Sequence, residues 1–420
     1  MPRARRTPTP VRARPELQGR DPVTPRRLTS TEAAARLGVK VQTLYAYVSR
    51  GLIGRETAAD GRSSLFDTEE IDEFMNGRAR ADEPLPQPHI ASSITRVDDA
   101  GLWVRGRELV SMSGEAYEDV VDILWESGNG EVWNVPQELL DGVADLQSEM
   151  PAAAQGLDRL RATVAFASAS DPMRHDLSAR SVRAAGRQLL TLMVDGLRDA
   201  KSGAPQGDLL ADRLWVALAD RNGPPIQRDA LNAAMVLLID HGLAASNFAA
   251  RVAGSVRADP YSAVCAGLGV VGGALHGAAS SGVHEMLESA AGSRGAAHAV
   301  GAARRRLGVL PGFGHKVYET RDPRCEELMI WISRAWHDDP RLRVVSEVHD
   351  VIRSRTDAVP NIDLALGALT FLAGMPPSAG EVIFAISRTA GWIAHAAEEY
   401  AEEAHRFRVR ARYVGPEPST

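Results

Sequence analysis

The sequence has little cysteine and no long uninterrupted apolar segment, and each shortage excludes a class of protein. Only two residues are cysteines, Cys265 and Cys325, which is too few for a disulfide framework. We therefore expect a reducing compartment, the cytoplasm. No apolar run approaches the roughly 20 residues that a membrane-spanning helix needs, so no membrane segment is expected.

The chain also lacks a strong charge of either sign. Its net charge of −6 gives no whole-chain signal for binding to nucleic acid or to an anionic membrane. Hydrophobic residues make up 44% of the 420 residues, which allows a large buried core in two or three domains. The sequence contains no Cys/His metal spacing, no P-loop and no dinucleotide-binding glycine motif after a strand. Neither a metal nor another cofactor is expected.

The N-terminal quarter predicts a tail and a small domain. Residues 1–27 are rich in Arg and Pro and lack the apolar segment of a secretory signal. We interpret them as a disordered basic arm, with contact to nucleic acid as the alternative. Residues 28–75 predict a compact unit. It begins with a helix in "LTSTEAAARLGV" capped by Thr29 or Ser30, and continues with a helix in "KVQTLYAYVSRG", a short β-wing and a helix in "DTEEIDEFM".

This unit resembles the winged helix-turn-helix domains of the MerR and excisionase type, since two short helices are joined through Leu-Gly-Val. The resemblance implies that the second helix enters the major groove of DNA. There it would present Lys40, Gln42, Thr43 and Tyr45. Arg50 and Arg55 would lie near phosphate groups. Because basic residues are few and the third helix is acidic, a module that contacts protein, or nothing, stays an alternative.

The rest of the chain predicts a linker and a large helical domain. Residues 76–90 are polar and contain three prolines, which is typical of a linker. Apolar residues then recur at helical spacing, for example in residues 179–199 and 228–255, and one hairpin is expected near residues 92–109. The predicted fold class is therefore mainly α.

Several polar residues lie in apolar or glycine-rich surroundings. His276 in "GLGVVGGALHGAASSG" and His315 in "PGFGHK" are flanked by glycines, which allow backbone to approach a ligand closely. Asp363 leads into a nearly all-apolar helix, where desolvation would raise its pKa and suit a general base, although a helix N-cap is the alternative. Arg388 lies on another apolar helix, where an arginine pairs with a carboxylate of the protein or of a ligand.

These residue types together suggest one class of chemistry. Arginines bind dicarboxylates bidentately, neutral histidines polarise carbonyl oxygens, and a carboxylate removes a proton from carbon next to a carbonyl. Taken alone, His241, at the end of an apolar helix, would be interpreted as a helix cap or a hydrogen-bonded core residue. Arg408, in a basic C-terminal strip, would be interpreted as part of a solvated tail. The pattern predicts enolisation followed by carbon–carbon bond formation, with a small dicarboxylate as the acceptor.

Residues 90–420 resemble the citrate synthase family. The motifs that carry this resemblance occur in the family's order: "IDHGLAASNFAARV", "GGALHGAASSGVHEML", "PGFGHKVYETRDPR", "PNIDLALG", "SRTAGWIAH" and "RVRARYVGP". The resemblance implies a large helical domain, residues 91–277 and 369–420, and a small helical domain, residues 278–368, that closes over the substrate. It also implies an obligate homodimer.

The resemblance further implies that acetyl-CoA, oxaloacetate and water are converted to citrate and CoA, or that propionyl-CoA is used by a 2-methylcitrate synthase. Asp363 would remove a proton from the acyl-CoA, His276 would stabilise the enol, and His315 would polarise the ketone. The substrate carboxylates would be held by His241, Arg324, Arg388 and Arg408, the last reaching into the neighbouring subunit's site. The CoA adenine would be recognised by the backbone of Leu310, Pro311, Gly312, Phe313 and Gly314.

The sequence departs from the family at several positions near these residues. The family usually has Glu and Asn where this chain has Gly242 and Ala244, and Asn where it has Ser280. These differences leave the identity of the acyl-CoA substrate open. A roomier apolar pocket near Leu364 and Leu366 would accept propionyl-CoA. A DNA-binding regulator whose synthase-like domain senses a ligand is the alternative from another class.

Overall fold

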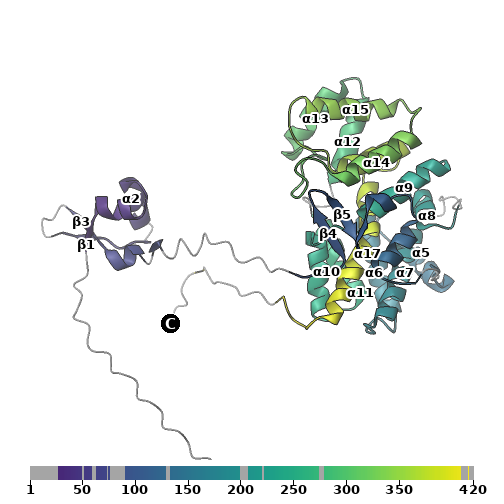
Figure 1. Cartoon of the computed structure of the whole chain (residues 1–420), viewed down its shortest axis with the longest axis horizontal. Coiled ribbons are helices and arrows are strands. Elements are labelled where there is room, and N and C mark those ends of the chain that lie inside the picture. Colours follow the sequence, from purple (N-terminus) through teal and green to yellow (C-terminus); the bar gives the residue numbers. More distant parts are fainter. Residues whose placement is uncertain are drawn as a thin grey trace, which may run out of the picture. The chain divides into compact units, whose positions relative to one another are not determined.

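The computed structural model describes most of the chain. The described residues are 27–49, 52–58, 63–72, 74–75, 90–128, 133–198, 207–219, 222–273, 279–407 and 415. Most of the predicted arm and linker, together with Arg50, His276 and Arg408, lie outside them. The chain divides into two units, Met1–Ala91 and Ser92–Thr420, and each is described by itself (Figure 1).

The first unit contains the predicted helix-turn-helix. Helix α1 (Ser30–Arg36) begins at Thr29, whose hydroxyl accepts the Glu32 N–H while the Glu32 carboxylate accepts the Thr29 N–H. This reciprocal capping satisfies two N–H groups that a helix start leaves unpaired, and it confirms one of the two predicted caps. Gly38, with a φ of 65°, turns the chain into α2 (Val41–Ser49).

A small antiparallel sheet packs with these helices. Its strands are β1 (Arg27–Thr29), β2 (Glu56–Thr57) and β3 (Ser64–Asp67), in the order β1-β3-β2. Strands β2 and β3 pair antiparallel within the segment where the sequence predicts a wing. Apolar side chains from helices and strands form the core of the unit: Leu28, Ala33, Ala34, Leu44, Ile53, Phe66 and Ile71.

The second unit begins with the predicted hairpin. Strands β4 (Thr95–Asp98), β5 (Gly101–Val104) and β6 (Arg107–Glu108) form an antiparallel sheet, and a 3-10 turn, η1 (Val110–Met112), follows. The hairpin brings Thr95 to the side chain of Asp240, 145 residues later in the chain.

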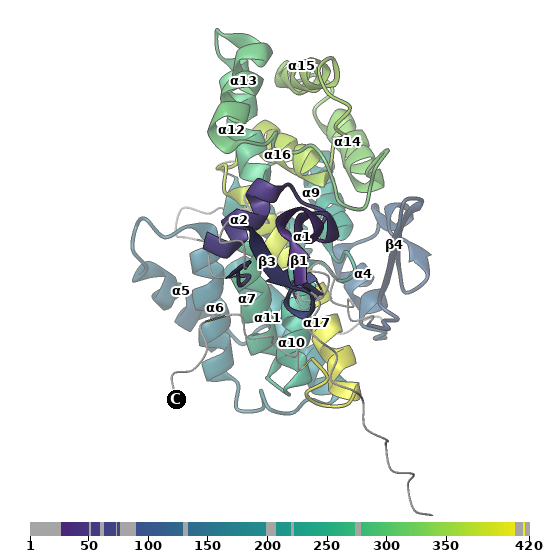
Figure 2. The same ribbon diagram turned by 90° about the vertical axis from the view of Figure 1, so that its left-hand side faces the viewer.

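Helices make up the rest of this unit. They are α4 (Tyr117–Leu124), α5 (Gln137–Ser148), α6 (Gly156–Ser170), α7 (Ala179–Asp195), α8 (Leu210–Leu218), α9 (Pro225–Leu238), α10 (Ala245–Ser255), α11 (Pro260–Val271), α12 (Ala279–Ala291), α13 (Gly295–Leu307), α14 (Pro323–Ala335), α15 (Arg341–Arg353), α16 (Ile362–Ala373) and α17 (Ala379–Ala401). The predicted mainly α class is confirmed. In both views α12, α13, α14 and α15 gather at one end of the unit (Figures 1 and 2).

Helix α17 is the central element of this unit. It contacts α6, α7, α9, α10 and α11, and its side chains are buried along most of its length, as expected for a helix that is apolar on all faces. Two of its polar residues, Arg388 and His395, are therefore placed in the interior.

The long apolar segment 228–255 is divided into α9 and α10. The break lies at residues 239–244, where Gly242 has a φ of 56° that a side chain would strain. His241 is consequently carried on a turn between two helices.

Candidate active site

The loop that carries His315 pairs with the segment leading into α16. The Asn361 N–H donates to the Gly312 carbonyl over 2.9 Å, and the Asn361 side-chain amide donates to the Gly314 carbonyl over 2.8 Å. Gly312 has a φ of 79°, and a Cβ there would lie 3.0 Å from the α16 backbone. Glycine is therefore required at this position, and the pairing brings His315 beside the helix start that carries Asp363.

Three aromatic rings meet at this loop. The His315 ring stacks on Tyr318, with centroids 4.7 Å apart, and the His241 ring approaches His315 edge-on at 5.3 Å. The His241 Nε2 lies 3.2 Å from the Tyr318 hydroxyl. Tyr318, which is 1% exposed and was not among the predicted site residues, thus connects the two histidines.

Both histidines are neutral at pH 7. Burial lowers the pKa of His315 and, more strongly, that of His241, and the positive charge of Arg324 lowers both further. The Nδ1 atom of His315 accepts the N–H groups of Val317 and Tyr318, at 3.0 and 3.2 Å. The His315 proton therefore lies on Nε2, which can donate a hydrogen bond to a ligand.

Asp322 fixes the position of Arg324. As the N-cap of α14 it accepts the Arg324 N–H, and its two oxygens accept from the Arg324 Nε and Nη2 at 3.0 and 2.8 Å. Its Oδ2 also accepts the Ile362 N–H at the start of α16. Within the described residues the Arg324 Nη1 makes no hydrogen bond, so one edge of the guanidinium stays available for a ligand carboxylate.

Asp363 lies in the first turn of α16, where the N-cap is Asn361, whose side chain accepts the Asp363 N–H over 3.0 Å. The alternative in which Asp363 itself caps the helix is therefore wrong. Burial raises the pKa of Asp363 to about 6, against the opposing charge of Arg324. The carboxylate accepts no hydrogen bond from any described residue, which leaves it free to accept a proton from a ligand.

Arg388 reaches the site from α17. Its Nε donates to the Leu238 carbonyl at the end of α9 over 2.8 Å, and its guanidinium lies over the Phe384 ring at 4.6 Å. Burial lowers the pKa of Arg388 to about 10, so the side chain is still charged at neutral pH. Its hydrogen-bond partner in the protein is a carbonyl, and a ligand carboxylate would complete the expected pairing.

Electrostatic interactions connect five of the predicted residues through the two arginines. Arg324 acts on His241, His315 and Asp363, and Arg388 acts on His241 and Asp363. Two others, His276 and Arg408, lie outside the described residues. Asp322 was missed, although an acidic residue directly before Pro-Arg at a helix start is a recognisable N-cap signal.

A cavity of about 790 Å³ opens beside this cluster. Phe313, Asp322 and Leu364 line it next to the site, and Phe313 stacks on His349 at 6.4 Å. Leu366 is fully buried and does not line the cavity, so an apolar acyl pocket could involve Leu364 but not Leu366.

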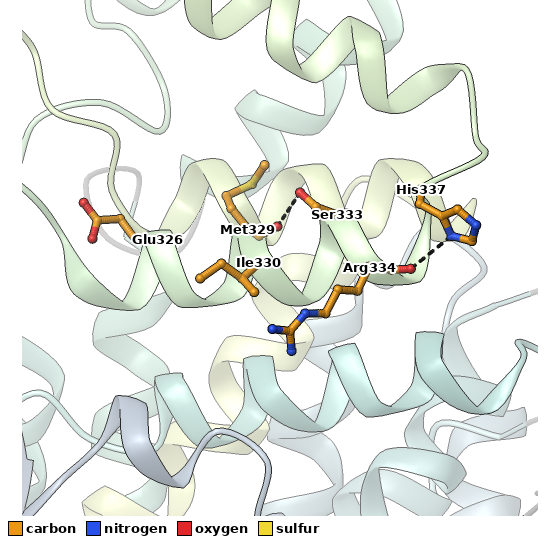
Figure 3. Close-up of a pocket in the computed structure, with 6 residues that line it drawn as sticks. All are labelled: Glu326, Met329, Ile330, Ser333, Arg334 and His337. Atoms are coloured by element: carbon orange, nitrogen blue, oxygen red, sulfur yellow. Dashed lines mark hydrogen bonds between the residues drawn. The ribbon is translucent and has the colours of Figure 1, made fainter.

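A second, shallower depression of about 570 Å³ lies on α14 (Figure 3). Its polar groups bond within their own segment: the Ser333 hydroxyl donates to the Met329 carbonyl, and the His337 ring contacts the Arg334 carbonyl. Because these groups do not converge on a common point, we assign no site here.

In the part of the chain that the structure describes, no cluster of three or more His, Cys, Asp or Glu is arranged to hold a metal ion. No helix among the same residues combines the length and the apolar character needed to cross a membrane.

In the first unit, the predicted DNA-contacting residues lie at the start of α2. Lys40, Gln42 and Tyr45 are exposed, and Thr43 is half-buried. The Tyr45 hydroxyl lies 3.0 Å from the Ser30 hydroxyl and 3.2 Å from that of Ser64, so helix and sheet hold this ring in place.

Comparison with protein families agrees with this organisation. The model of the citrate synthase C-terminal domain matches residues 87–410, and that of a helix-turn-helix domain matches residues 27–79. The chain belongs to the citrate synthase family and carries a helix-turn-helix domain ahead of the family's domain, as predicted.

Curated relatives include two kinds of synthase. The citrate synthase of Haloferax volcanii is 30% identical over 357 residues, 77% of this chain and 93% of the relative. The 2-methylcitrate synthase 1 of Corynebacterium glutamicum is 26% identical over 69% of this chain and 82% of its own length. Citrate synthase 2 of Bacillus subtilis is 32% identical over half of this chain, and the match spans only 56% of that relative.

Solved structures show the same fold. Citrate synthase of Thermoplasma acidophilum, in a ternary complex with carboxymethyl coenzyme A and oxaloacetate, has a TM-score of 0.67 at 23% identity, covering 81% of this chain and 97% of that one. Citrate synthase of Thermotoga maritima has a TM-score of 0.65 at 24% identity, covering 80% and 96%. The predicted citrate synthase-like fold is confirmed.

Proposed function

We propose that the chain condenses an acyl-CoA with oxaloacetate, with acetyl-CoA as the first candidate and citrate and CoA as products. The observation that carries this proposal is the convergence on one site of Asp363, with its raised pKa, two neutral histidines and two buried arginines. These are the groups that enolisation next to a thioester and attack on a keto-dicarboxylate require.

Asp363 is assigned the role of general base. With a pKa of about 6 it is mostly ionised at pH 7 and more basic than an ordinary aspartate, so it can take a proton from the carbon next to the thioester. The enol that results needs a hydrogen-bond donor at the thioester oxygen. His276 is assigned this role from the family resemblance.

His315 is assigned to the ketone of oxaloacetate. Its Nε2–H would donate to the ketone oxygen while the enol carbon attacks the ketone carbon. The new alkoxide takes up the Nε2 proton, the proton that Asp363 removed passes to solvent, and His315 regains one from solvent. Water then hydrolyses the thioester and releases CoA as the free thiol. The carboxylates of oxaloacetate would be held by Arg324 through its Nη1, by Arg388 and by His241.

The acyl-CoA is assigned to the cavity of about 790 Å³ beside Asp363. Its adenine would bind the backbone of residues 310–314, where Pro311 and Gly312 are buried and Gly314 is exposed. Leu364, at the inner end, would contact the acyl group.

A homodimer completes the proposed site. The antiparallel helices α10 and α11 leave an uncharged outer face with exposed Val252, Val256 and Cys265, and Leu243 is exposed just before α10. An exposed face of this kind is typical of a subunit interface. The family resemblance assigns Arg408 of each subunit to the neighbouring site, and the molar mass in solution tests the dimer.

The test of the function is release of free thiol by the purified chain with oxaloacetate and either acetyl-CoA or propionyl-CoA, with Asp363→Asn as the control. Turnover that the substitution abolishes supports the proposal, and the ratio of kcat/KM values names the acyl-CoA. No thiol release with either thioester would contradict it.

Two observations favour second candidates. Relatives named 2-methylcitrate synthases, together with Leu364 in the cavity, favour propionyl-CoA as an alternative substrate, which the same assay decides. The helix-turn-helix domain favours DNA binding, alone or as a ligand-sensing regulator. The test is the affinity of the whole chain for duplex DNA at two salt concentrations, with and without oxaloacetate, where no salt-sensitive affinity would exclude it.

A further inference from the structure

Asp240, the residue directly before His241, is a fully buried carboxylate that the proposed chemistry does not use. Its two oxygens are surrounded by donors: the Asn247 amide at 2.6 Å, the Thr95 hydroxyl at 2.5 Å, the Gly242 N–H at 3.0 Å and the His395 Nε2 at 3.2 Å. Although burial alone would raise the pKa of Asp240, the hydrogen bonds from His395 and Thr95 and the positive charge of Arg388 lower it, so the Asp240 carboxylate is ionised.

His395, on α17, is buried and bridges Asp240 to a second charge. Its Nδ1 lies 2.8 Å from the Nη1 of Arg251, on α10. An arginine can only donate, so the His395 Nδ1 is an acceptor and the proton lies on Nε2, which donates to Asp240. The two neighbours together fix the tautomer and the orientation of the His395 ring.

Arg251 is itself held by carboxylates. Its Nε donates to the fully buried Glu399, and its Nη1 and Nη2 donate to Glu398, all at 2.6 Å. Glu398 also accepts the Ser93 N–H over 2.8 Å, which connects the segment before strand β4 to this network. Removing one partner from such a buried ionic network leaves an uncompensated charge, so its members hold one another in a single arrangement.

This network acts on the backbone on both sides of His241. Asp240 accepts the Gly242 N–H, and the Asn247 side chain donates to the Gly242 carbonyl over 2.5 Å as well as to Asp240. A Cβ on Gly391 of α17 would lie 2.5 Å from Asp240 Oδ1, so glycine there allows the close approach. The turn is therefore clamped before and after the histidine.

We propose that Asp240 and His395 are positioning residues for the binding of oxaloacetate. His395 orients the carboxylate of Asp240, Asp240 fixes the turn, and the turn aims the His241 ring at the substrate carboxylate beside Tyr318. Neither residue touches the substrate. This inference rests on the proposed function.

The test uses the full-length chain and measures the dissociation constant of oxaloacetate by calorimetry, with KM and kcat alongside. We expect His395→Leu and Asp240→Asn each to raise both the dissociation constant and KM for oxaloacetate at least tenfold, roughly the effect of losing one well-oriented hydrogen bond to a charged group. The kcat should change less than KM. His395→Gln, whose amide keeps one acceptor and one donor, should restore most of the affinity.

A matched control separates positioning from general loosening of the fold. Arg187→Met breaks another buried ion pair, between Arg187 on α7 and Asp122 on α4 at 2.7 Å, and this ion pair includes none of the described residues of the candidate site. We expect it to lower the melting temperature without changing the affinity for oxaloacetate.

Two outcomes overturn the positioning role while wild-type binding is intact: unchanged affinity in both His395→Leu and Asp240→Asn, or an equal loss of affinity in Arg187→Met. If the wild-type chain itself binds no oxaloacetate, the proposed function fails and this role fails with it. The wild-type titration thus distinguishes the two failures.

Discussion

Replacing Asp363 by asparagine should stabilise the protein at neutral pH while it removes activity. The side chains have nearly the same shape, but asparagine carries no charge. Burial raises the pKa of Asp363 to about 6, which means that the folded state resists its ionisation. At pH 7.5 the carboxylate is ionised nevertheless, and this ionisation lowers the free energy of unfolding.

The size and sign of this effect follow from the linkage between proton binding and stability. Each pKa unit corresponds to about 1.4 kcal/mol, so ionised Asp363 lowers the free energy of unfolding by about 3 kcal/mol at pH 7.5. Between the ordinary aspartate pKa and about 6, the folded state binds more protons than the unfolded state. Wild-type stability therefore falls as pH rises through this window, and the advantage of Asp363→Asn at pH 5.0 shrinks to roughly half of its value at pH 7.5.

Denaturant unfolding of both proteins at pH 7.5 and 5.0 measures this difference. The same preparations should show a kcat/KM for thiol release lowered by roughly 10²–10⁴-fold in Asp363→Asn, the range for loss of a general base. If the wild type and Asp363→Asn have the same free energy of unfolding at both pH values, Asp363 is not desolvated. A stable variant with full turnover would refute its assignment as the base.

Three further predictions concern the same site. Arg324→Lys should raise KM for oxaloacetate at least tenfold, since lysine cannot make the two parallel bonds to Asp322, and steady-state kinetics with unchanged KM would contradict this. Tyr318→Phe removes the hydroxyl near His241 and should raise that KM by roughly two- to fivefold with kcat nearly unchanged; a large fall in kcat would give Tyr318 a chemical role. In a pH series, kcat/KM should fall tenfold per pH unit below pH 6, as Asp363 takes up a proton. If kcat/KM instead begins to change near pH 7, a site histidine titrates there, contrary to the lowered pKa of His241.

Local sequence signals were sufficient for much of the fold. The capping pair Thr29 and Glu32 and the hairpin near residues 92–109 lie where the sequence predicts them, because each depends on residues close together in the chain. The sequence predicts the end of an apolar helix at His241, but the positive φ of Gly242 was not predicted, since the apolar periodicity of residues 228–255 continues through it. Its backbone is set by contacts with Asp240 and α17.

For the candidate site too, the sequence predicts residues that lie in recognisable local motifs but not contacts between distant segments. The loop that carries His315 and the helix start that carries Asp363 are brought together because the glycine loop pairs with Asn361, and motif order alone could not show that pairing. Tyr318, Asp240 and His395 were missed. The last two meet across 155 residues, and buried polar partners at such a separation leave no periodic signal in the sequence.

Two of the departures from the family pattern, Gly242 and Ser280, lie where the backbone or the packing leaves little room for a larger side chain. Gly242 adopts a φ of 56°, so a glutamate there would strain this turn, and Asn247 braces it instead. Ser280, at the start of α12, is fully buried, and a Cβ on Gly380 of α17 would lie 2.5 Å from its hydroxyl, which leaves little room for an asparagine. Among the described residues, neither change removes a group from the cluster around Asp363. A protein that only sensed oxaloacetate would need the arginines but not a desolvated base, so the retained Asp363 favours the synthase over the sensor.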